Sequence, residues 1–133
     1  TAVNKATWQG ASYKIETTIR ADVSLPLATD GVSEFYDNRV TVRILRSDGS
    51  EFFSRTFTKA DFKPYVDNAY YKDGALLGIV FDKAQGSQLH FAASVGSPDK
   101  SSDEYVPLVL TVNNQGAVAI SRDTETDATA PEE

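Results

Sequence analysis

The residues of this sequence that could take part in catalysis are few, and their types exclude several reactions. The chain has one histidine, His90, no cysteine, and 19 aspartates and glutamates. Without cysteine it has no thiol nucleophile, no disulfide and no thiolate metal ligand. A serine hydrolase would need His90 beside a serine nucleophile and a buried carboxylate, and the sequence has no nucleophile-elbow motif. Among so many carboxylates some pair will lie at a glycosidase separation by chance, and no spacing singles one out. We therefore expect a protein without enzymatic activity.

Four arginines gather in residues 39–57, RVTVRILRSDGSEFFSRTF, a segment typical of two strands joined by a turn. If the Asp-Gly dipeptide at 48–49 forms a two-residue turn, Arg55 lies on the opposite face of the hairpin from Arg39 and Arg43. A three-residue loop with a bulge would instead bring these three arginines onto one face, as an anion-binding patch. Asp-Gly is a strong signal for a two-residue turn, so we favour the first register.

Two acidic loops are candidates for binding calcium. Residues 29–38, TDGVSEFYDN, and 97–104, SPDKSSDE, supply oxygen ligands of the kind that calcium prefers, and the second loop holds Asp99, Asp103 and Glu104. Neither loop has the spacing of an EF-hand. Asp, Asn and Ser also form hydrogen bonds within turns, so we favour ordinary turn structure over a structural calcium ion and expect no other cofactor.

Aromatic side chains are a further set of candidate binding residues. Trp8, Tyr36 and Tyr71 lie near predicted loop ends, where an apolar ring with a polar tip can stack on a sugar or anchor a protein partner. The alternative for each of them is a place in the core or at its rim.

The length and composition are those of one folded domain. The chain has 133 residues, of which 41% are hydrophobic and 24% charged. No apolar run reaches the roughly 18 residues of a transmembrane segment. With 13 basic and 19 acidic residues the net charge is −6, which argues against nucleic acid as a partner. We expect a single domain over residues 8–122, followed by a disordered acidic C-terminal tail over residues 123–133.

Segments rich in β-branched and aromatic residues recur at short intervals along most of the chain, each bounded by turn-forming residues. This pattern predicts an all-β fold, an antiparallel β-sandwich of about eight strands, with a small lipocalin-like β-barrel as the alternative. At most one short helix is expected, a single turn after Thr58, where Asp61 has the spacing of a capping residue.

Two hairpins have predicted registers. In residues 105–121, YVPLVLTVNNQGAVAIS, we expect a three-residue loop that ends at Gly116 in the left-handed conformation. In residues 39–57 the two-residue turn is favoured. The pairs expected across the two loops are Val112 with Val118, Leu110 with Ile120, Ile44 with Phe53, and Val40 with Phe57.

The segment SDGSEFFSRTFTKADF, residues 47–62, together with the closing hairpin, resembles small exported proteins of Bacteroidetes. Many of these are predicted lipoproteins that belong to families of domains of unknown function. The resemblance covers about residues 8–122. It implies an exported chain, located in the periplasm or at the cell surface, whose signal peptide and membrane-anchoring cysteine preceded Thr1. It carries over no catalytic residue.

Three functions remain, of which the first is favoured. It is a non-enzymatic protein of the cell envelope that binds a protein partner or a glycan through loops or an exposed sheet face. The alternative is a barrel that carries a small apolar ligand. An open cavity lined by Leu76, Ile79 and Phe91 would support this alternative, and a filled core would oppose it. A carboxylate-dependent glycoside hydrolase ranks last.

Overall fold

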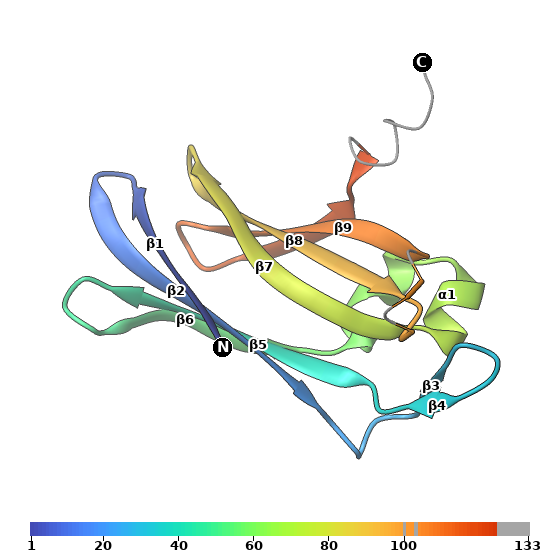
Figure 1. Cartoon of the computed structure of the whole chain (residues 1–133). Helices are drawn as coiled ribbons and strands as arrows, with labels where there is room; N and C mark the ends of the chain where they lie inside the picture. Colours follow the sequence, from blue (N-terminus) through green and yellow to red (C-terminus); the bar gives the residue numbers. More distant parts are fainter. Residues whose placement is uncertain (100, 103, 125–133) are drawn as a thin grey trace.

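The computed structural model, which describes residues 1–99, 101–102 and 104–124, has two four-stranded antiparallel sheets that pack face to face (Figure 1). In order across the sheet, the first contains β1 (Ala2–Trp8), β2 (Ala11–Ala21), β5 (Asn38–Arg46) and β6 (Glu51–Phe57). The second contains β10 (Val118–Arg122), β9 (Tyr105–Asn113), β8 (Gln88–Gly96) and β7 (Ala75–Gln85). The segment of chain that connects β2 to β5 contains two short strands, β3 (Ala28–Thr29) and β4 (Glu34–Phe35), which pair with each other. The predicted all-β sandwich is therefore confirmed, and over the described residues neither sheet closes into a barrel.

Strand β1 is an element that the sequence did not predict, and it precedes residue 8, where the expected domain begins. Its residues are mostly small or polar, so they lack the alternation of large apolar side chains that marks a strand. The turn at Gln9 and Gly10 brings β1 alongside β2. Backbone φ is positive at both residues, as a two-residue hairpin loop requires. Most of the tail predicted after residue 122, from residue 125 onward, lies outside the described residues.

The core is one cluster of apolar side chains drawn from the facing sides of both sheets. Alternation places Ile15 of β2 and Val42 of β5 on the inner face of the first sheet, where both are fully buried. Leu76, Ile79 and Phe91 of the second sheet belong to the same cluster and are at most 2% exposed. The space between the sheets is therefore filled at these residues, which counts against the apolar-carrier alternative.

The β5–β6 hairpin combines features of both predicted registers. The expected pairs, Val40 with Phe57 and Ile44 with Phe53, are confirmed. The two-residue turn is wrong, because the Arg46 N–H donates to Ser50 O at 2.8 Å and so encloses a three-residue loop. An irregularity between Ile44 and Leu45 then shifts the pairing by one residue and restores the expected register along the strands.

The closing hairpin has the predicted register throughout. Val112 pairs with Val118, and Leu110 pairs with Ile120. The loop ends at Gly116, whose φ of 79° lies in the left-handed region that glycine adopts without strain. This confirms the hairpin expected from the sequence.

Two short helices connect β6 to β7. The helical turn expected after Thr58 forms as the 3₁₀ helix η1 (Lys59–Tyr65), and the Thr58 N–H donates to the Asp61 carboxylate at 2.9 Å. The α-helix α1 (Asn68–Asp73) follows it, and the sequence did not predict this helix because its adjacent tyrosines are typical of a strand. Among the described residues, no helix has the length and apolar character needed to cross a membrane.

Candidate functional site

The three arginines considered as an anion-binding patch do not meet. Arg39 and Arg43 project from the outer face of the first sheet, whereas Arg55 lies opposite Val42, whose side chain points into the core. The Arg55 guanidinium lies over the ring of Phe57, 5.0 Å from its centroid, at the margin of the sandwich. The cross-strand register thus separates Arg55 from the other two.

The three candidate aromatic residues lie at three separate places. Trp8 is buried in the core, and its indole N–H donates to Gly86 O at 3.0 Å. Tyr36 is exposed in the connection between β4 and β5. Tyr71 of α1 is half-buried, and the ammonium groups of Lys59 and Lys63 lie 4.9 and 5.5 Å from its ring centroid. These three side chains do not form a common binding surface.

In the acidic loop before β9, the Asp99 side chain forms hydrogen bonds within the turn. Its carboxylate accepts hydrogen bonds from the Ser101 N–H at 2.9 Å and from the Ser101 hydroxyl at 2.8 Å. Glu104 is part of the same loop, and its carbonyl oxygen accepts a hydrogen bond from the Ser97 N–H. Asp103 lies outside the described residues. Within the described part of the chain, no three acidic or histidine side chains gather as metal ligands.

A buried ion pair between Asp37 and Lys59 is a feature that sequence reasoning missed. The two side chains are 3% and 11% exposed, and the Lys59 ammonium lies 3.7 Å from the Asp37 carboxylate. The carboxylate also accepts hydrogen bonds from the N–H groups of Asn38 and Leu76, and Lys59 donates to Gly74 O at 2.7 Å. Because these partners come from β5, η1 and the start of β7, the pair fastens the two sheets together at this end of the sandwich.

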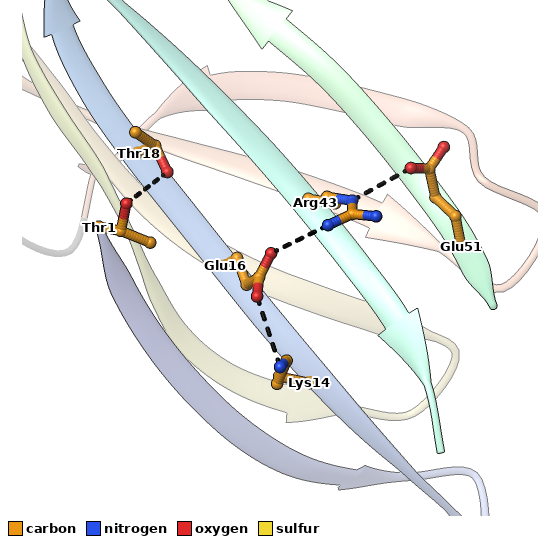
Figure 2. Close-up of polar contacts among 6 residues, drawn as sticks. All are labelled: Thr1, Lys14, Glu16, Thr18, Arg43 and Glu51. Atoms are coloured by element: carbon orange, nitrogen blue, oxygen red, sulfur yellow. Dashed lines mark hydrogen bonds and ion pairs between the residues drawn. The ribbon is translucent and has the colours of Figure 1, made fainter. Parts of the chain in front are cut away.

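The outer face of the first sheet carries a ladder of ion pairs across three strands (Figure 2). Glu16 of β2 lies between Lys14 and Arg43, at 3.5 Å from each, and Arg43 also reaches Glu51 of β6 at 3.2 Å. All four side chains are on the solvent side, where each such pair contributes at most about 1 kcal/mol. The ladder therefore does little for stability, but it orients charged groups on this face.

A hollow of about 520 Å³ lies at the end of this face, beside the β1–β2 and β5–β6 turns. Lys5 and Lys14 are directly opposite each other on neighbouring strands, and Leu45, which pairs with Lys14 from the other side, is buried. None of the lining residues is acidic. We call this feature the basic hollow; it is lined by Lys5, Ala6, Thr7, Ser12, Tyr13, Lys14, Leu45, Arg46, Ser47 and Gly49.

The carboxylate nearest to the basic hollow in sequence, that of Asp48, is held by its own turn. It accepts hydrogen bonds from the Ser50 hydroxyl at 2.6 Å and from the Ser50 N–H at 2.9 Å. These two bonds, and to a smaller extent the charge of Arg46, hold the pKa of Asp48 below its ordinary value of 3.8. The carboxylate therefore stays ionised at neutral pH and is bound within the turn.

The basic hollow supplies positive charge and hydroxyl groups, and Leu45 in its lining is largely buried. Its lining residues include neither a carboxylate nor an imidazole that could act as a general base. This set of cations and hydroxyls is suited to holding an acidic group. The sequence signal that could have found it is the pair of lysines at 5 and 14, but their meeting depends on the unpredicted strand β1.

Comparison with known proteins identifies the family of this chain but assigns no activity to it. No curated protein matches the sequence. A family model described as a domain of unknown function, DUF4738, matches residues 1–120, as the resemblance to families of this kind predicted. Because the match covers most of the 133 residues, the chain belongs to the DUF4738 family.

Proposed function

We propose that this protein is a non-enzymatic binding protein of the cell envelope, and that its basic hollow holds an acidic glycan. The observation that carries the proposal is the placement of Lys5 and Lys14 across from each other, with no acidic residue lining the hollow, in a chain of net charge −6. Like charges directly opposite each other on neighbouring strands are destabilising. A bound anion would remove that repulsion.

The residues of the hollow match the parts of an acidic sugar. A carboxylate or sulfate group would lie between the two lysines, while the hydroxyls of Thr7, Ser12 and Ser47 would exchange hydrogen bonds with those of the sugar. The volume of about 520 Å³ falls within the range of roughly 300–1,000 Å³ that is usual for sites of small ligands.

An acidic ligand would have to compete with Glu16 for Lys14. Their ion pair has a separation of 3.5 Å, and the Lys14 side chain is 46% exposed. Exposed pairs of this kind contribute at most about 1 kcal/mol, whereas a hydrogen bond to a charged group contributes about 1.5–3 kcal/mol. Release of Lys14 from Glu16 to an anionic ligand is therefore energetically accessible.

The test is calorimetric titration of the chain with hexuronate-containing oligosaccharides, with neutral oligosaccharides of equal length, and with an oligoglutamate peptide. We expect the acidic sugars to bind and to be recovered unchanged, and Lys5→Gln/Lys14→Gln to weaken their binding at least tenfold. The matched control is Arg20→Gln/Arg39→Gln, which removes another cross-strand pair of cations from the same face. This control is expected to change the affinity less than twofold.

Three outcomes would contradict the proposal. One is that the acidic sugars bind no better than the neutral ones, and another is that both double variants weaken binding equally, as a diffuse charge effect would. Binding of oligoglutamate alone would replace the glycan with an acidic segment of a protein partner.

We also propose that the protein acts outside the cytoplasm, in the periplasm or at the cell surface, held by a lipid anchor upstream of Thr1. The resemblance of residues 47–62 and of the closing hairpin to small exported Bacteroidetes lipoproteins supports this location. Fractionation of cells that express the natural gene would test it, and recovery of the protein in the cytoplasmic fraction would contradict it.

A further inference from the structure

Strand β7 is an edge strand whose charged residues, Asp82 and Lys83, lie toward its C-terminal end. The four edge strands of the two sheets are β1, β6, β7 and β10. Strand β6 carries Glu51 and Arg55, β1 carries Lys5, and β10 has only five residues. By contrast, β7 is 11 residues long, and its first seven residues, ALLGIVF, are uncharged. An edge of this kind exposes unpaired backbone N–H and C=O groups to any chain that can pair with them.

Exposed apolar side chains gather along this edge. Val80 is 56% exposed and Leu77 36%, and Ile19 of β2 is exposed beside them. These side chains lie at the side of the sandwich where β1 and β7 approach each other. On the other side, η1 packs against β10.

A hollow lies on each side of the β7 edge. The inner hollow, of about 350 Å³, is a groove at the margin of the sandwich, lined on the side of the first sheet by Ile19 and Val40. The outer hollow, of about 330 Å³, lies on the outer surface of the second sheet, over Ala92 and Ser94 of β8. Three residues of β7 line both hollows; they are Leu77, Gly78 and Val80. Successive side chains of a strand point to opposite faces, so a strand added to this edge would direct its side chains alternately into the two hollows.

The occupant that fits these features is a second copy of β7. Two copies related by a twofold axis present the same surface to each other, so exposed side chains and receiving hollows must both lie on that surface. Strand β7 provides both, since Val80 and Leu77 are exposed and line the two hollows. The seven uncharged residues would meet without like charges, while the net charge of −6 opposes contact between copies at acidic surfaces.

We propose that two copies of this chain pair antiparallel along β7, which joins their second sheets into one continuous eight-stranded sheet. The pairing with β8 shifts between Leu76 and Gly78 and again between Phe81 and Lys83, so the regular part of β7 is Gly78–Phe81. The twofold axis passes near this segment. Because the regular segment is short, the dimer is in equilibrium with the monomer. The inference is independent of the basic hollow, which is lined by other strands.

Sedimentation velocity of the full chain, from about 1 μM to about 1 mM, tests the proposal together with two matched variants. Val80→Lys puts a charge on the β7 edge, and Val3→Lys puts one on the β1 edge at a valine of almost equal exposure, 54% against 56%. We expect wild type and Val3→Lys to dimerise with the same dissociation constant, and Val80→Lys to raise that constant at least tenfold. Circular dichroism would show that each variant is folded.

Cysteine cross-linking gives a second readout, because the chain has no cysteine of its own. Under mild oxidation we expect Val80→Cys to form a disulfide-linked dimer and Val3→Cys to remain monomeric. The proposal is overturned by a wild-type chain that stays monomeric at every concentration. It is also overturned by a dimer that survives Val80→Lys, or by equal effects of the two lysine variants.

Discussion

Asp37 and Lys59 are the two ionisable residues whose burial the fold most depends on. Removing a carboxylate and an ammonium from water is costly, and the cost is offset only where both groups also have hydrogen-bond partners. Here the carboxylate has two backbone donors, and the ammonium has a backbone acceptor. Both buried groups of the pair therefore have backbone hydrogen-bond partners in addition to each other.

Asp37→Ala is expected to lower the free energy of unfolding by roughly 3–5 kcal/mol, because it leaves the Lys59 ammonium buried and the Leu76 N–H without its acceptor. Asp37→Asn should cost less, since the amide oxygen can still accept from Leu76. Urea denaturation measures both changes. The control is Glu51→Ala, which breaks a pair whose side chains are about half exposed and should cost less than about 1 kcal/mol. Equal losses for Asp37→Ala and Glu51→Ala would show that the buried pair has no special role.

The candidate site residues illustrate what single residue types can and cannot predict. The cluster of arginines in residues 39–57 suggested an anion-binding patch. The favoured register correctly placed Arg55 on the other face of the hairpin from Arg39 and Arg43. No pattern in the sequence pairs Asp37 with Lys59, because the two residues lie in different elements and neither belongs to a repeating motif. The pairing of Lys5 with Lys14 could not be predicted for a related reason. Strand β1 has too few large apolar residues to be recognised as a strand.

At the scale of elements, the hairpins were predictable wherever glycine and apolar alternation agreed. The closing hairpin has both signals, so its loop and its pairs were predicted correctly. In the β5–β6 hairpin the alternation correctly predicted the pairs of buried residues, but the loop at Asp48 and Gly49 has three residues and not two. Its Asp48 carboxylate bonds to Ser50 instead, and the larger loop is absorbed by a bulge. Burial of one face thus determined the register more strongly than the turn residues did.

Gly96, at the end of β8, marks a place where three strands of the second sheet come close together. It pairs with Ala75 of β7 and with Tyr105 of β9. A Cβ atom at this position would collide with the Glu104 carbonyl oxygen and lie 2.5 Å from Tyr105 Cα. Both obstacles are backbone atoms that cannot turn away. The end of the sheet therefore requires glycine here for lack of space.

Gly96→Ala should lower the free energy of unfolding by about 1–3 kcal/mol, the usual cost of an added methyl group in a packed site. The control is Gly78→Ala, because a Cβ atom on Gly78 would meet nothing within 4 Å. Alanine also loses less backbone entropy than glycine on folding, so this second change should be neutral or stabilising by up to about 1 kcal/mol. Chemical denaturation of the two variants gives the comparison. A Gly96→Ala variant as stable as Gly78→Ala would mean that β9 can move away from β8.

At the scale of the whole molecule, each sheet depends on the other to bury its apolar face. The fold class was predictable because alternation along the strands shows that each has one apolar side. The order of the strands within each sheet was not predictable in the same way, because pairing between distant strands leaves no local signal. The basic hollow and the β7 edge are both consequences of that order.

This mutual dependence predicts that the two sheets unfold together. Trp8, the single tryptophan, packs against Tyr13 and Phe52 of the first sheet, while its indole N–H reaches Gly86 in the turn between β7 and β8. Its fluorescence therefore reports contact between the sheets, whereas far-ultraviolet circular dichroism reports the strands themselves. We expect the two signals to change at the same urea concentration with the same slope, about 1–3 kcal/mol per molar, as a two-state transition requires. A Trp8 transition at lower urea than the dichroism would instead show that the sandwich opens first at its Trp8 end, while the buried Asp37–Lys59 pair still holds the other end.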